Sequence, residues 1–191
     1  MISAILLAAG ESKRMGELKQ LLPFGTSTIV ENCIANLLAS NIDELIVVLG
    51  HRSSEIEAKL QGLPLKTVIN QSYREGMTRS IQTGLASVNP QTRAVLLALV
   101  DQPRIPSSII NRVIDAYKQS GAIIVKPRYQ GKSGHPVIID MACRAEIESL
   151  DPSVGLNQIT RAHAANTLFI DLDSPAVIDD IDTPEDYKRQ R

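Results

Sequence analysis

The 191-residue sequence lacks long apolar runs, has only two cysteines and carries almost no net charge. No apolar run approaches the roughly 18 residues that span a bilayer, and no basic start like that of a signal peptide precedes the first apolar segment. Both absences predict a cytoplasmic protein. A net charge of −1 argues against a nucleic-acid or anionic membrane partner, because such surfaces usually need a basic excess. Cys33 and Cys143 lie in or beside helical patterns and are expected to be buried small hydrophobic residues, not a disulfide or a metal pair.

The sequence does contain a regular alternation of strand-like and helical segments. Apolar, β-branched runs indicate strands buried on both faces, and they cover residues 2–8, 44–50, 66–70, 94–101, 122–127, 135–140 and 167–172. Helical patterns lie between them, one starting near Thr28 and the others at 53–61, 78–87, 107–119, 142–149, 153–164 and 184–190. This alternation predicts a single three-layer α/β/α domain over residues 1–191, with a mostly parallel sheet and a short antiparallel insertion at 135–140.

Polar or permissive residues follow several of the predicted strands, and ligands of open α/β sheets bind at the carboxyl ends of strands. The first such loop contains three cations, Lys13, Arg14 and Lys19. Gly10 permits a positive φ and a close approach of the backbone to a ligand. Arg14 offers a planar fork that fits phosphate, and Lys19 offers a point charge. The glycine spacing is that of neither a P-loop nor a dinucleotide fingerprint, and a solvated turn with scattered cations is the alternative.

Carboxylates form the second feature. Asp101 ends the apolar run 94–101, where a turn or cap aspartate is the alternative. The segment DDIDTPEDY (179–187) adds Asp179 and Asp180, whereas Asp182 could simply belong to the turn before the last helix. Two carboxylates from distant segments are what a Mg²⁺ ion shared with a triphosphate needs. The cationic loop and the acidic pair therefore predict a site for phosphate and a metal ion.

Five segments resemble one family in the same order along the chain. LLAAGESKRMGELKQLLPFG (6–25) resembles the signature of the MobA-like nucleotidyltransferases, in particular their molybdenum cofactor cytidylyltransferase branch. The other similar segments are NQSYREGMTRSIQTGL (70–85), VDQP (100–103), SGHPVII (133–139) and DIDTPEDY (180–187). The resemblance implies a sheet of nucleotide-diphospho-sugar transferase type. It also implies a Mg²⁺-dependent reaction that transfers a nucleoside monophosphate, CMP from CTP, to the terminal phosphate of molybdopterin and releases pyrophosphate.

The resemblance also implies a role for each site residue. The implied catalytic residues are Arg14, Lys19 and Asp101. The implied nucleotide-binding residues are Ala8, Ala9, Gly10, Arg14, Lys19, Asn70, Gly76 and Ser80. Asp101 and Asp180, or Asp182 in place of Asp180, would hold Mg²⁺. His135 would face the acceptor, with a structural histidine beside Pro136 as the alternative. No general base is required, since the acceptor phosphate is already ionised near pH 7.

One segment departs from the family pattern. Members usually carry G-D-x-G-A-R near residues 151–157, where this chain has Ser153 and Asn157 at the positions of the aspartate and the arginine. Arg161, one helical turn onward, is a candidate to compensate. The departure leaves nucleotidyl transfer credible and puts molybdopterin as the acceptor in doubt.

Base choice and function class are further expectations. The guanylyl branch reads L-A-G-G where this chain has LAAG (7–10), so the methyl group of Ala9 narrows the base pocket and favours CTP over GTP. Three functions remain: a cytidylyltransferase acting on molybdopterin, a nucleotidyltransferase with GTP or another phosphorylated acceptor, and a non-enzymatic protein that delivers the cofactor. Intact Asp101 and Asp180 favour an enzyme, and a molybdoenzyme that receives the product is the expected protein partner.

Overall fold

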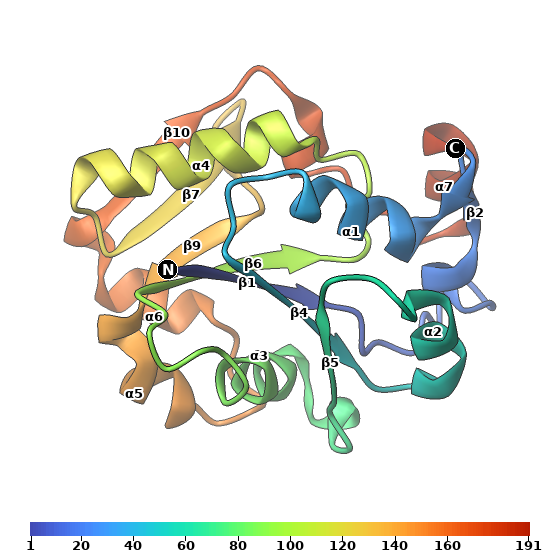
Figure 1. Ribbon diagram of the computed structural model, residues 1–191. Coiled ribbons are helices and arrows are strands. Elements are labelled where there is room, and N and C mark those ends of the chain that lie inside the picture. Colours follow the sequence, from blue (N-terminus) through green and yellow to red (C-terminus); the bar gives the residue numbers. More distant parts are fainter.

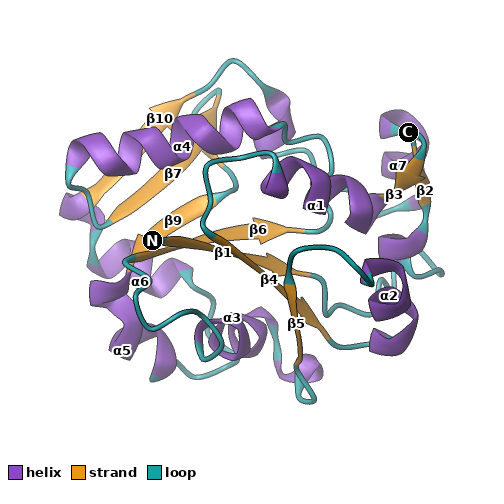
Figure 2. Cartoon of the chain, viewed as in Figure 1, coloured by secondary structure: helices purple, strands orange, loops and turns teal.

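A computed structural model describes all 191 residues, with a central sheet as its organising element (Figures 1 and 2). The strands lie in the order β10-β7-β9-β6-β1-β4-β5, and β8 pairs with β7 beside this row. Their bounds are β1 Ile2–Leu7, β4 Glu44–Leu49, β5 Lys66–Ile69, β6 Ala94–Leu99, β7 Ile124–Tyr129, β8 Lys132–Ser133, β9 Val137–Asp140 and β10 Thr167–Asp171. A separate two-stranded hairpin contains β2 Pro23–Phe24 and β3 Ser27–Thr28.

The sheet is parallel except at β9, in the predicted insertion, and at the short strand β8, which is antiparallel to β7. Strand β1 pairs in parallel with both β4 and β6, and β10 pairs in parallel with β7. Strand β9 is antiparallel to β6 on one side and to β7 on the other. The expected antiparallel element at 135–140 is therefore confirmed, although the strand itself begins at Val137.

Helices cover both faces of the sheet (Figure 2). Their bounds are α1 Ile29–Leu38, α2 Ser53–Leu60, α3 Met77–Leu85, α4 Ser107–Ser120, α5 Arg144–Glu148, α6 Asn157–Ala162 and α7 Pro184–Gln190. The apolar residues of α1, α2 and α4 belong to one buried cluster, and those of α3, α5 and α6 belong to another. Alternate residues of β1 supply the two clusters, since Leu6 belongs to the first and Leu7 to the second. The three-layer α/β/α prediction is confirmed.

Local side-chain chemistry explains where several helices begin. Thr28 and Glu31 form a capping box that starts α1, and Thr183 caps α7 in the same way. The helix expected from residue 153 begins only at Asn157. The reason is that the Asp151 carboxylate accepts hydrogen bonds from the backbone N–H and the hydroxyl of Ser153, which hold the chain in a turn.

The two cysteines are buried and unpaired, as the sequence predicts. Cys33 belongs to the cluster beneath α1, whereas Cys143 belongs to the cluster on the opposite face of the sheet, so the two thiols are separated by the sheet. None of the helices combines the length and the apolar character that a membrane span requires.

Candidate active site

The loop that follows β1 is held open by a buried amide. The side-chain N–H₂ of Gln20 donates to the carbonyls of Ala8 at 3.1 Å and Gly10 at 3.0 Å. The Ser12 hydroxyl donates to the Gln20 side-chain carbonyl at 3.2 Å. The positive φ that Gly10 would permit is found instead at Ser12 (53°) and Gly16 (71°). Gln20 is fully buried and shapes the loop, a role that no sequence motif indicated.

This loop forms one wall of a cavity of about 390 Å³ at the carboxyl edge of the parallel strands. The other walls come from the segment before α3, from the first turns of α3, from the residues after β6 and from the C-terminal segment. The lining residues from the predicted set are Ala9, Gly10, Arg14, Lys19, Gly76, Ser80, Asp101 and Asp182. The structure thus brings together two cations, two carboxylates and the expected glycines.

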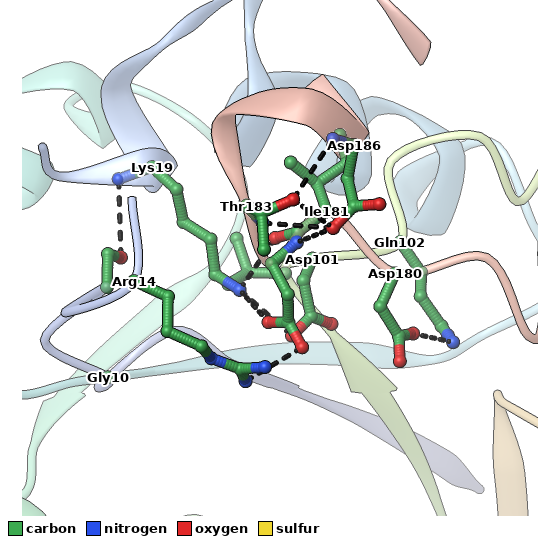
Figure 3. Close-up of polar contacts among 12 residues, drawn as sticks. Gly10, Arg14, Lys19, Asp101, Gln102, Asp180, Ile181, Thr183 and Asp186 are labelled. Atoms are coloured by element: carbon green, nitrogen blue, oxygen red, sulfur yellow. Dashed lines mark hydrogen bonds and ion pairs between the residues drawn. The ribbon is translucent and has the colours of Figure 1, made fainter. Parts of the chain in front are cut away.

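Lys19 is the centre of the charged cluster (Figure 3). Its ammonium group donates to Asp101 Oδ2 at 3.1 Å, to Asp182 Oδ1 at 3.1 Å and to the carbonyl of Ile181 at 3.0 Å. Its side chain is only 11% exposed, whereas the side chain of Arg14 is 71% exposed and contacts Asp182 Oδ2 at 2.8 Å. The second oxygen of Asp101, Oδ1, is buried and has no hydrogen-bond partner. A buried carboxylate oxygen without a donor is free to bind a cation.

Asp180 points away from this cluster and does not line the cavity. Gln102 donates from its side-chain N–H₂ to Asp180 Oδ1 at 2.7 Å and to the carbonyl of Val177 at 3.2 Å. Loss of hydration raises the pKa of Asp180, and the negative charge of Asp101 raises it further. Of the two carboxylates considered from the sequence, Asp182 lines the cavity. Asp180 binds Gln102 outside the cavity lining, and Figure 3 shows this contact.

Two other predicted nucleotide-binding residues lie behind the cavity. Ala8 is fully buried in the apolar cluster that includes residues of α1, α2 and α4, and its carbonyl accepts a hydrogen bond from Gln20. Asn70 is 3% exposed, and its amide donates to Ser80 Oγ at 3.0 Å while its carbonyl accepts from the N–H of Ser72 at 2.9 Å. The structure therefore gives Asn70 the role of positioning Ser80, with no lining contact of its own.

An apolar surface lies at the end of the cavity nearest α3. Tyr73, Met77 and Ala9 line it, and Met77 is 57% exposed. A Cβ on Gly50 would lie 2.9 Å from the Ala9 methyl carbon and 2.8 Å from Tyr73 Cβ, so Ala9 and Tyr73 leave no room for a side chain at that glycine. Gly76 has a φ of +125°, and a Cβ there would lie 2.8 Å from the carbonyl oxygen of Pro152, so both conformation and space require glycine.

His135 lies in a second cavity and not in the first. This cavity, of about 570 Å³, is lined by polar and cationic side chains, among them Lys126, His135, Asn157, Thr160 and Arg161. Burial lowers the pKa of His135 to about 4, with a further contribution from Lys126, so the imidazole is neutral at pH 7. The carbonyl of Val177 accepts both from the N–H of His135 at 2.9 Å and from the side-chain N–H₂ of Gln102 at 3.2 Å.

Similar proteins include enzymes of two kinds. The chain is 29% identical to the molybdenum cofactor cytidylyltransferase of Escherichia coli (strain K12), over 97% of this chain and 93% of that protein. It is also 29% identical to the nicotine blue oxidoreductase of Paenarthrobacter nicotinovorans, over 98% of this chain and 95% of that protein. The fold closely matches the crystal structure of Rv0371c from Mycobacterium tuberculosis H37Rv, with a TM-score of 0.87, 29% identity and coverage of 99% and 96% of the two chains.

A second structure of that mycobacterial protein is its complex with manganese, with a TM-score of 0.79, 26% identity and coverage of 99% and 97%. The family model of the MobA-like NTP transferase domain matches residues 4–167 of this chain. That match covers most of the sheet, the opening loop with Arg14 and Lys19, and Asp101. The chain belongs to the family of MobA-like NTP transferase domains.

Proposed function

We propose that the protein transfers CMP from CTP to the terminal phosphate of a molybdopterin and releases pyrophosphate. The observation that carries this proposal is the placement of Arg14 and Lys19 against Asp101 and Asp182 in one cavity at the carboxyl edge of the sheet. Membership of the family and the similarity to a molybdenum cofactor cytidylyltransferase support the same reaction.

The reaction makes modest demands on the protein. An oxygen of the acceptor phosphate forms a bond to the α-phosphorus of the nucleotide, and the bond from that phosphorus to the bridging oxygen breaks, so pyrophosphate leaves with the electron pair. The acceptor phosphate is already ionised near pH 7, and no side chain has to remove a proton. Positioning and charge neutralisation therefore supply the catalysis. Arg14 and Lys19 are the groups that would neutralise the charge of the leaving pyrophosphate.

The carboxylates fit a divalent cation. Asp101 has a buried oxygen without a partner, and Asp182 reaches the same ammonium group as Asp101. Hard oxygen ligands of this kind suit Mg²⁺, which would neutralise charge on the reacting phosphates when bound. We assign this role to Asp101 and Asp182. We assign Asp180 to positioning Gln102, in place of the metal-binding role expected from the sequence.

The apolar end of the cavity would hold the base. Ala9, Tyr73 and Met77 line that end of the cavity, and Ser80, held by Asn70, adds a hydroxyl to the same lining. The Ala9 methyl and Tyr73 Cβ both lie within 2.9 Å of the place that a Cβ on Gly50 would take, so the Ala9 methyl would narrow this end of the pocket. A narrower pocket favours a pyrimidine over a purine, which supports CTP as the donor.

The second cavity would hold the acceptor. Lys126 and Arg161 give it positive charge suited to a phosphorylated ligand, and Arg161 lines the same cavity as Asn157, which occupies the place of the family arginine. The neutral imidazole of His135 would offer a hydrogen bond and not a charge. The product would then pass to a molybdoenzyme.

Pyrophosphate release tests this function. The protein is incubated with Mg²⁺ and each of the four NTPs, with and without molybdopterin, beside an Asp101→Asn control. Release that requires both CTP and molybdopterin is the expected result. Release with GTP, or only with another phosphorylated acceptor, would retain the transferase and replace the substrate. Nucleotide binding without release under any of these conditions would overturn the transferase in favour of a carrier or a different chemistry.

A further inference from the structure

Three potential metal ligands meet on the face of the sheet that carries α5 and α6 (Figure 1). They are the Cys143 thiol, the Glu146 carboxylate and the His163 imidazole, and one ligand atom from each lies within 4.8 Å of the others. His163 Nε2 is 3.0 Å from both carboxylate oxygens of Glu146. None of the three residues lines the nucleotide cavity or the second cavity, so the proposed function does not use them.

The Cys143 thiol differs from the Cys33 thiol in its hydrogen bonding. Cys33 is buried, and its Sγ donates to the carbonyl of Val100 at 3.5 Å. Cys143 is fully buried, and its Sγ has no hydrogen-bond partner although a carboxylate and an imidazole lie beside it.

We propose that Cys143, Glu146 and His163 form a binding site for a transition-metal ion of the Zn²⁺ type, separate from the nucleotide cavity. Sulfur, nitrogen and oxygen are the three ligand types that Zn²⁺ accepts, whereas Mg²⁺ takes oxygen ligands. Binding converts the thiol to a thiolate, whose sulfur bonds to the metal while its proton passes to solvent. Water completes the fourth position, because Glu146 and His163 are partly exposed.

The geometry needs only a small adjustment. Ligand atoms around a tetrahedral Zn²⁺ lie about 3.3–3.8 Å apart, given bonds of about 2.0–2.3 Å. The separations here reach at most 4.8 Å, so a movement of about 1 Å closes the site. The Glu146 side chain is 46% exposed and free to make that movement.

The site would join α6 to the segment that begins α5. Cys143 and Glu146 lie at the start of α5, and His163 ends α6. Helix α6 also carries Asn157 and Arg161, which line the second cavity. A bound ion would therefore fix the helix that shapes that cavity, at a distance from the phosphate chemistry.

Cobalt titration of the full, reduced and metal-free chain tests the site. A Co²⁺–thiolate bond gives a charge-transfer absorption band that oxygen ligands do not give, so ions at Asp101 and Asp182 do not contribute to the signal. The wild type should develop the band, and Zn²⁺ should displace it. Cys143→Ser should lose the band, and His163→Asn should weaken it. Cys33→Ser and Asp101→Asn are matched controls that should retain it.

A thermal melt gives a second readout. Zn²⁺ should raise the melting temperature of the wild type and of Asp101→Asn, but not that of His163→Asn, whose substitution lies at the surface. The cooperative melt of each variant also establishes that it is folded. Absence of the band from reduced wild type in excess Co²⁺ would overturn the site. A band lost in Cys33→Ser and kept in Cys143→Ser would also overturn it.

Discussion

Replacement of Lys19 by alanine gives the sharpest test of the charged cluster. The ammonium group is the only bridge between Asp101 and Asp182, and it also binds the carbonyl of Ile181. Removal leaves two neighbouring carboxylates without their shared cation. The substitution should therefore change three quantities in different directions: the stability of the free protein, its affinity for a divalent cation and its affinity for nucleotide.

Stability should fall markedly. Leaving one partner of a buried ion pair without its counter-charge costs about 3–5 kcal/mol. The side chains of Asp101 and Asp182 are 23% and 29% exposed, so hydration of these carboxylates offsets part of this cost. We expect the free energy of unfolding of Lys19→Ala to be lower by about 2–3 kcal/mol, which corresponds to about 4–12 °C in melting temperature for a chain of this length. Arg14→Ala, the matched control, loses an exposed pair and should lose about 0–1 kcal/mol.

Ligand affinities should move in opposite directions. Lys19 competes for the carboxylates that would bind a divalent cation, so without nucleotide Lys19→Ala should bind Mn²⁺ more tightly than the wild type. Its affinity for CTP should fall by about 10- to 150-fold, because a charge-assisted contact worth about 1.5–3 kcal/mol is lost. Electron paramagnetic resonance measures free Mn²⁺, and calorimetry measures CTP binding. Equal or weaker Mn²⁺ binding by the variant, or unchanged CTP affinity, would refute the reasoning.

Five other substitutions test the remaining assignments. Asp101→Asn and Asp182→Asn should each lower the rate of pyrophosphate release at least about 100-fold, whereas Asp180→Asn should retain most of it, and the reverse order would restore Asp180 as the ligand. The free energy of unfolding should fall by up to about 3 kcal/mol as pH drops from 6.5 to 4, because His135 gains a proton in the unfolded state over this range but stays largely neutral in the folded state. Urea titrations at several pH values measure this dependence, and it should be weaker in His135→Gln. Ala9→Gly should reduce the preference for CTP over GTP about 10-fold in competitive calorimetry, and an unchanged preference would exclude a role for the methyl group.

Most of the sheet could be predicted because its strands are buried on both faces. A run such as ISAILL is apolar except for one small residue, Ser3, and all six of its residues are buried, so it lacks the alternating polar face of a surface strand and the polar face of a surface helix. The elements that were missed, β2, β3 and β8, contain two residues each, too few for any hydrophobic period to show. The late start of α6 depends on one side chain, Asp151, whose bonds to Ser153 compete with the first helical turn.

Several residues that line the cavity could be predicted because they follow strands of the sheet. Lys19 and Asp101 are charged residues in loops that follow buried strands, so their position and type both indicated a function. Gln20 and Gln102 have no such signal, because an amide side chain in a polar segment is typical of the protein surface. Only the structure shows that Gln20 binds the Ala8 carbonyl and that Gln102 binds the Asp180 carboxylate. Asp180 and Asp182 are two residues apart in a segment without regular period, and only the fold decides which of them turns toward the cavity.

The C-terminal segment 177–182 explains why the fold and the site have to be considered together. The family match ends at residue 167, so Asp182 lies beyond it, yet Asp182 shares Lys19 with Asp101 from the matched region. The same segment supplies the Ile181 carbonyl to Lys19 and the Val177 carbonyl to both Gln102 and His135. A displacement of this segment would therefore alter the contacts of Lys19 in the first cavity and the backbone contact of His135, which lines the second, at once.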